Sequence, residues 1–170
     1  LISLAAAVPI VLIEKIVGKR IAIFRAMPNI PVVVEEGATA VASNSAVVAA
    51  QRKLVENIFR AVGVVCFVEE DLMHAVTALS GSGPAYFFLV IEALIDAGVH
   101  IGLPRDMATE LAVQTAAGSA LLMRETKRHP AVLRNAVSSP GGTTAEALLV
   151  LESSGLRAAF VEAVIAAYEK

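Results

Sequence analysis

The sequence predicts two successive parts, an α/β part followed by an all-α part, with helices dominating overall. Two observations carry this prediction. Before about residue 69, short apolar runs alternate with helical patterns. After it, every periodic segment is helical, and clusters of Gly, Pro and Ser separate the segments. The predicted domains are therefore residues 1–69 and 70–170.

The first part is predicted to alternate strands with helices. Strands are expected at 1–4, 20–25, 39–42 and 64–68, and helices at 9–17 and 46–62. Pro9 suits a first helical turn, and Gly63 ends the second helix. Pro28 and Pro31 exclude regular helix around them, because a proline pushes the residue before it toward extended geometry. We expect a rigid loop at 27–31.

Turn clusters predict the helix boundaries of the second part. They lie at 80–84, 102–104, 128–130, 139–142 and 153–155. The Ser-Gly-Ser-Gly-Pro cluster at 80–84 follows a helical pattern and has no Gly-Lys-Ser ending, so it does not match a phosphate loop. We expect it to be a turn between two helices.

The apolar composition indicates that part of the surface is covered by lipid or by another protein chain. Hydrophobic residues make up 56% of the 170 residues, and a bilayer span needs about 18 or more consecutive apolar residues. The most apolar stretch, 85–103, is interrupted by Glu92, Asp96 and His100, whose four-residue spacing forms one polar stripe on a helix. This pattern favours a partner helix, and hence an obligate homodimer, over a membrane; a membrane hairpin is the disfavoured alternative.

Other features exclude whole classes of function. The net charge is −2, with 14 basic and 16 acidic residues and no basic run, so nucleic-acid binding is not expected. The apolar start lacks a basic leader, which argues against export. Cys66 is the only cysteine and lies in an apolar run, so we expect it buried in a protein of the cytoplasm. The three histidines have no metal-ligand spacing, so no metal is expected.

The segment 137–146, Val-Ser-Ser-Pro-Gly-Gly-Thr-Thr-Ala-Glu, is the strongest candidate for chemistry. Thr143 and Glu146 have the spacing of a capping box at a helix start. Backbone N–H groups at such a start attract an anion, and the hydroxyls of Ser139, Thr143 and Thr144 add donors. The pattern predicts a site for a carboxylate or phosphate; a plain helix cap is the alternative.

An acidic trio, Glu69, Glu70 and Asp71, follows directly on the last predicted strand. The carboxyl ends of strands are where α/β proteins commonly place ligand groups. Acidic side chains also stabilise the start of a helix. The position of the trio is compatible with both roles.

Taken in order, several segments are similar to the pyrroline-5-carboxylate reductase family. They are 2–7, 25–31, 36–39, 68–72, 78–86, 102–104 and 129–152. The most specific is Ser-Ser-Pro-Gly-Gly-Thr-Thr at 138–144. The resemblance implies that residues 1–69 are the second half of a Rossmann-like NAD(P)-binding domain and 70–170 an all-helical substrate-binding and dimerisation domain. Because the family's glycine-rich opening is absent and the chain starts at Leu1, we expect a longer natural sequence.

The resemblance also implies an activity. The family reduces the imine of 1-pyrroline-5-carboxylate to L-proline, the last step of proline biosynthesis, with NADPH or NADH as the hydride donor. It works as a homodimer, or as a higher oligomer of dimers. The alternative is a non-catalytic dimerisation module that binds a proline-like carboxylate; a glycine fingerprint upstream of Leu1 would favour the enzyme.

The resemblance assigns roles residue by residue. The implied substrate contacts are Glu70, Ser139, Gly142, Thr143 and Thr144. Of these, Thr144 would lie beside the imine nitrogen and is the candidate catalytic residue. The implied cofactor contacts are Leu4, Ala5, Ala6 and Asn135. Asn135 is assigned loosely, because the family often has an amide at the position of Ala136.

Overall fold

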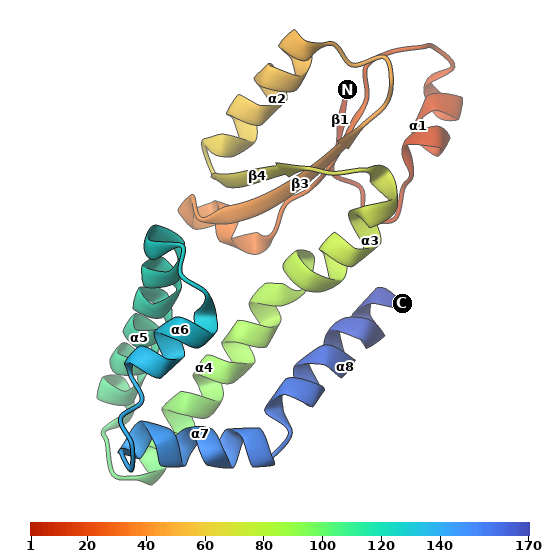
Figure 1. Ribbon diagram of the computed structural model, residues 1–170. Coiled ribbons are helices and arrows are strands. Elements are labelled where there is room, and N and C mark those ends of the chain that lie inside the picture. Colours follow the sequence, from red (N-terminus) through yellow and green to blue (C-terminus); the bar gives the residue numbers. More distant parts are fainter. The chain divides into compact units, whose positions relative to one another are not determined.

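The structure is a computed structural model that describes residues 1–170 (Figure 1). It contains two compact units. The first comprises Leu1–Ala85 and Val164–Lys170, and the second comprises Tyr86–Ala163. This division follows packing, so the predicted functional boundary after residue 69 stays a prediction. Helices dominate the chain, as the sequence predicted.

The first unit is built on a four-stranded mixed sheet of order β1-β2-β3-β4. The strands are β1 (Ile2–Ser3), β2 (Phe24–Met27), β3 (Gly37–Ser43) and β4 (Gly63–Phe67). β1 pairs with β2, and β3 with β4, in parallel, whereas β2 and β3 are antiparallel. All four strands were predicted, with shifted ends.

The largest shift is in β2, which begins at Phe24 and not at residue 20. The reason is Asn44, whose side chain takes the place of a neighbouring strand. Its Oδ1 accepts a hydrogen bond from the Ile23 N–H at 3.1 Å, and its Nδ2 donates to the Ile21 carbonyl at 2.9 Å. The Ile23 N–H and the Ile21 carbonyl are therefore satisfied by a side chain before the ladder starts.

One helix covers each face of the sheet (Figure 1). Helix α1 (Ile10–Val17) and helix α2 (Ala49–Arg60) lie on opposite sides. The alternation of side chains along β3 supplies both cores, because Ala40 and Ala42 face the α1 side and Val41 faces α2. Val55 and Phe59 of α2 complete the second core.

Cys66 is exposed, so the prediction of a buried cysteine is wrong. β4 alternates like β3: Val65 and Phe67 pack toward α2, and Val64 and Cys66 face the other way. On that side α1 packs against β2 and β3 and leaves this part of β4 uncovered. An apolar run in the sequence does not show whether a helix packs on both faces of the strand.

The segment around Asn29 differs from the loop predicted at 27–31. Ile30–Val34 forms a 3-10 helix, η1, with Pro31 in its first turn, where a missing N–H costs no hydrogen bond. Asn29 anchors its start: Oδ1 accepts from the Ala38 N–H at 2.8 Å, and Nδ2 donates to the Ser80 carbonyl at 3.3 Å.

A continuous helical run of 31 residues extends over Glu70–His100. It comprises η2 (Glu70–Leu72), α3 (Met73–Val76), η3 (Thr77–Gly81) and α4 (Gly83–His100). The predicted turn at 80–84 is therefore wrong. η3 is a π-helical turn in which Ser82 N–H donates to the Thr77 carbonyl at 2.8 Å. This wider turn lets the helix continue past Pro84, which has no N–H to give.

The same run is long and apolar enough to cross a membrane by length and composition alone. A helix in the core of a soluble protein passes that test too, so it is weak evidence for a span. The expectation that a partner helix covers this segment stays a prediction.

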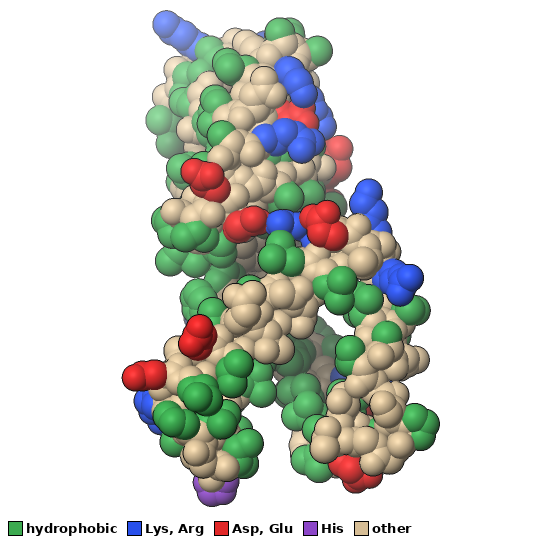
Figure 2. All heavy atoms as spheres, turned by 90° about the vertical axis from the view of Figure 1, so that its left-hand side faces the viewer, with side chains coloured by type: hydrophobic (Ala, Val, Ile, Leu, Met, Phe, Trp, Pro, Cys, Tyr) green, Lys and Arg blue, Asp and Glu red, His purple; other side chains and the backbone are tan.

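The remaining helices are α5 (Arg105–Thr126), α6 (Pro130–Ala136), α7 (Thr143–Ser153) and α8 (Leu156–Tyr168). The predicted turns at 102–104, 128–130, 139–142 and 153–155 all lie between helices, as expected. Ala108 is the only hydrophobic residue of Tyr86–Ala163 that is buried. Phe87 and Leu89, for example, are 70% and 68% exposed, and Figure 2 shows hydrophobic side chains spread over the surface. This unit closes no core of its own.

Candidate functional site

The start of α7 is the best-formed candidate site in the second unit. Gly142, with extended φ and ψ of −81° and 164°, is the residue before the helix, and Thr143 is its first residue. The Gly142 carbonyl accepts the first hydrogen bonds, from Ala145 N–H at 3.0 Å and Glu146 N–H at 3.3 Å. The predicted capping box of Thr143 and Glu146 is therefore wrong, because the capping position holds a glycine without a side chain.

Because no side chain caps the helix, hydrogen-bond donors at its start lack acceptors. The backbone N–H groups of Thr143 and Thr144 have no acceptor within the chain, and neither have the hydroxyls of Ser139, Thr143 and Thr144. Thr144 is half-buried, whereas Ser139 and Thr143 are exposed. Open N–H groups at the positive end of a helix dipole bind anions. The structure thus brings these predicted residues together at one helix start whose open donors suit an anion.

The turn before α7 is tightly folded. Gly142 N–H donates to the Ser139 carbonyl at 3.0 Å, and Gly141 has a positive φ of 67°. A Cβ on residue 142 would lie 3.1 Å from that carbonyl oxygen. A glycine at this position lets the backbone double back, so that the open N–H groups point outward.

Asn135 lies on the other side of the same turn, near the end of α6. It is exposed, and its carbonyl accepts the Ser138 N–H at 3.1 Å. With Arg134 and Ser138 it borders a hollow of about 350 Å³ between α6 and α7. The apolar lining of that hollow comes from Ala145, Leu148 and Leu149. α6 itself starts at Pro130, where His129 Nδ1 accepts the Ala131 N–H at 3.2 Å.

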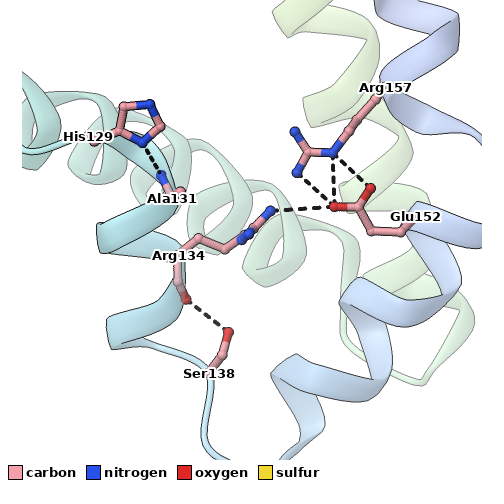
Figure 3. Close-up of polar contacts among 6 residues, drawn as sticks. All are labelled: His129, Ala131, Arg134, Ser138, Glu152 and Arg157. Atoms are coloured by element: carbon pink, nitrogen blue, oxygen red, sulfur yellow. Dashed lines mark hydrogen bonds and ion pairs between the residues drawn. The ribbon is translucent and has the colours of Figure 1, made fainter.

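A charged cluster joins α6, α7 and α8 beside this hollow (Figure 3). Both carboxylate oxygens of Glu152 accept hydrogen bonds from Arg157, at 2.7 to 3.0 Å. One of them also accepts a hydrogen bond from Arg134 at 3.4 Å. The hydrogen bonds from Arg157, aided by the charges of both arginines, lower the pKa of Glu152. The Glu152 carboxylate in turn raises the pKa of Arg157. Sequence reasoning missed this cluster, whose members lie up to 23 positions apart.

In the first unit, Glu70 has two definite partners. Its Oε1 accepts the Ile10 N–H, the first of α1, at 2.7 Å and pairs with Arg25 Nη1 at 3.1 Å. The Arg25 side chain is only 8% exposed, against 34% for Glu70. Glu70 therefore caps α1 and neutralises a buried charge, a structural role that sequence reasoning did not foresee.

The predicted cofactor contacts Leu4, Ala5 and Ala6 follow directly on β1 and are exposed. The Ala5 N–H donates to Ser3 Oγ at 3.3 Å, and Ala7 turns the chain with a φ of 58°. The carboxyl end of a parallel strand is where α/β folds bind cofactors. No hydrogen bond joins these residues to Glu70, but Ile10, whose N–H Glu70 accepts, follows closely in the chain.

Comparison with known proteins identifies the family. Residues 70–170 match the family model described as pyrroline-5-carboxylate reductase dimerisation. The chain belongs to the pyrroline-5-carboxylate reductase family. It is 54% identical over 149 residues to the pyrroline-5-carboxylate reductase of Synechocystis sp., covering 88% of this chain and 56% of that relative. Against the Escherichia coli enzyme it is 44% identical over 169 residues, covering 99% and 63%.

Solved structures of pyrroline-5-carboxylate reductases agree with the fold. The Coxiella burnetii structure matches with a TM-score of 0.95 at 48% identity, covering 99% of this chain and 63% of that one. The Plasmodium falciparum structure, with NADP bound, matches with a TM-score of 0.91 at 38% identity, covering 99% and 68%. The predicted fold class is confirmed. The chain spans less than two thirds of the length of the two curated relatives.

Proposed function

We propose that the protein carrying this chain reduces the imine of 1-pyrroline-5-carboxylate to L-proline with NADPH or NADH. The observation that supports this most is the uncapped start of α7 within the family's Ser-Ser-Pro-Gly-Gly-Thr-Thr segment. Two open N–H groups and three free hydroxyls there suit the carboxylate of a small ring.

In this proposal Gly142, Thr143 and Ser139 bind the carboxylate. The N–H groups of Thr143 and Thr144 donate along the helix axis, and the hydroxyls of Ser139 and Thr143 close around the anion. Fixing the carboxylate fixes the orientation of the ring, because the imine carbon is bonded within the same ring. Orientation of the two reactants supplies much of the rate in a hydride transfer.

Thr144 is the catalytic residue of the proposal. Its hydroxyl is half-buried and has no partner in the chain, so it is free to donate to the imine nitrogen. A protonated imine is the better hydride acceptor. An ordinary hydroxyl is a weak acid near neutral pH, so Thr144 orients the nitrogen and passes on a proton that water supplies.

The cofactor supplies the hydride, and we assign its binding in this chain to Leu4, Ala5 and Ala6, with Asn135 as a further contact. The first three are exposed at the end of a parallel strand, where small side chains leave the backbone accessible. NADP in the Plasmodium falciparum relative supports a nicotinamide dinucleotide. Glu70, held by Arg25 and Ile10, is assigned to the substrate side through its second oxygen.

We further propose a homodimer, or a higher oligomer of dimers, in the cytoplasm. The support is the exposed apolar surface of Tyr86–Ala163, in which only Ala108 is a buried hydrophobic residue, and the match of residues 70–170 to a dimerisation model. Burying that surface against a second copy removes apolar area from water.

The test is NADPH oxidation by the purified protein with 1-pyrroline-5-carboxylate, beside a blank without substrate. The proposal expects substrate-dependent oxidation and L-proline as the product. Binding of L-proline without any turnover, by a protein that also contains the cofactor-binding opening, would support the non-catalytic module instead. Light scattering of the same sample gives the oligomeric state.

A further inference from the structure

We propose that Glu152 is a positioning residue for the carboxylate site. Held by Arg157, it fixes Arg134 and, through Arg134, the start of the loop 137–142 that leads into α7. The inference rests on the proposed function, because the loop matters to activity only if the start of α7 binds the substrate carboxylate.

The first step is the orientation of Glu152. Arg157 Nε lies 2.8 Å from Oε2 and 3.0 Å from Oε1, and its Nη2 lies 2.7 Å from Oε1. A guanidinium that contacts both oxygens of a carboxylate fixes the plane of that carboxylate as well as its distance. Glu152 lies in the last turn of α7 and Arg157 in the first turn of α8, so the pair holds the carboxylate in place at the junction of the two helices (Figure 3).

The second step connects Glu152 to α6. Oε1 also pairs with Arg134 Nη1 at 3.4 Å, across 18 positions of sequence. The start of the loop bonds to the Arg134 carbonyl, which accepts the Ser138 hydroxyl at 2.9 Å (Figure 3). The same carbonyl accepts the Val137 N–H at 3.3 Å. The ion pair therefore joins the two helices that flank the loop.

The third step is the hollow between those helices. A surface hollow of about 350 Å³ lies between α6 and α7, so their apolar side chains do not close together at this point and do not alone fix the spacing of the helices there. Arg134 and Glu152 both line that hollow, and their ion pair joins α6 to α7 at its border. The spacing of α6 and α7 decides where Ser139 and the N–H groups of Thr143 and Thr144 point.

The test compares Glu152→Gln with wild type in the enzyme assay. Glutamine keeps the size but removes the charge. We expect the KM for 1-pyrroline-5-carboxylate to rise about fivefold, the scale of a partly exposed ion-pair network, with kcat changed less than about twofold. The KM for NADPH should stay unchanged, and amide hydrogen exchange should quicken at residues 139–144. Glu152→Asp, which keeps the charge, should recover part of the loss.

Glu56→Gln is the matched control. Glu56 is also held by two basic residues, Lys53 at 3.2 Å and Arg60 at 2.7 Å, but all three lie on α2. It should lose a similar ion-pair network without any change in the KM for 1-pyrroline-5-carboxylate. Arg157→Gln, which leaves the Glu152 charge in place but unoriented, should move the KM in the same direction as Glu152→Gln.

The outcomes separate the two proposals. An active wild type with an unchanged KM in Glu152→Gln overturns the positioning role and leaves the proposed function intact. An equal rise of KM in Glu56→Gln also overturns it, because the effect would then be general destabilisation. A wild type that neither turns over nor binds L-proline overturns both. If Glu152→Gln does not fold, Arg157→Gln decides by the same KM criterion.

Discussion

The Glu70 carboxylate accepts a hydrogen bond from the Ile10 N–H at 2.7 Å, across 60 positions of sequence. Helix α1 has no side-chain cap of its own, since Pro9 precedes it. Its cap comes from the residue that starts the long helical run after β4. One carboxylate thus ties the first helix, the buried Arg25 of β2 and the end of the sheet together.

Replacing Glu70 with alanine should destabilise the first unit by about 1–3 kcal/mol, because it leaves the Arg25 guanidinium buried without a partner and uncaps α1. Urea unfolding followed by circular dichroism measures the loss. Glu69→Ala is the control, since Glu69 is exposed and makes no side-chain hydrogen bond in the structure. Equal stability of the two variants would show that Glu70 carries no structural role.

Asn44→Ala should also cost about 1–3 kcal/mol, because the Ile23 N–H would lose its only acceptor in a partly buried position. The variant would also lose the hydrogen bonds that Asn44 Nδ2 donates to the Ile21 carbonyl at 2.9 Å and to Glu14 Oε1 at 2.8 Å. Asn57→Ala removes the same amide from an exposed position of α2 and should change stability by less than about 0.5 kcal/mol. Hydrogen exchange at Ile23 reports the difference locally.

Local patterns in the sequence were sufficient for the four strands, the two helices of the first part and four of the five turns. They failed where the local structure depends on a residue far away in the sequence, or on the absence of a packing neighbour. Asn44 replaces a strand neighbour at residues 21–23, and Cys66 lacks the cover that its apolar run suggested. At 80–84, Gly and Pro signals indicated a turn, but a π-helical turn anchored near Asn29 continues the helix.

The candidate site was predictable as a helix start, but only to within one position. Thr143 has the sequence spacing of a cap, yet Gly142 occupies that position and leaves the N–H groups open. The sequence could not predict the cluster of Arg134, Glu152 and Arg157, because each of these residues alone is typical of an exposed helix surface.

Acidification should weaken the ion pair between Glu152 and Arg157, which joins α7 to α8. Hydrogen bonds from Arg157 lower the folded-state pKa of Glu152 below its ordinary value of about 4.5. A carboxyl with a lowered folded pKa contributes its stability above the unfolded pKa and loses it as pH falls through the folded pKa. The thermal midpoint of the wild type should therefore fall below about pH 4.5 more steeply than that of Glu152→Gln. Parallel curves would contradict this coupling.

Thr144→Ala separates binding from chemistry at the start of α7. The N–H of residue 144 survives the substitution, so carboxylate binding should weaken little, whereas the hydroxyl assigned to the imine nitrogen is lost. In the complete enzyme we expect kcat to fall about 10- to 100-fold with a small change in KM, the range for an orienting or proton-relaying group. Thr144→Ser keeps the hydroxyl and should retain most of the activity.

Oligomeric state is the control for that experiment. Thr144→Ala removes one hydroxyl and one methyl group, too little apolar surface to dissociate an oligomer, so the variant should elute with wild type on gel filtration. A dissociated variant would mean that the residue supports assembly, and its loss of turnover could not then be assigned to the imine. An intact oligomer with full turnover would remove Thr144 from the chemistry and leave Ser139 and Thr143 as the unpartnered hydroxyls at the start of α7.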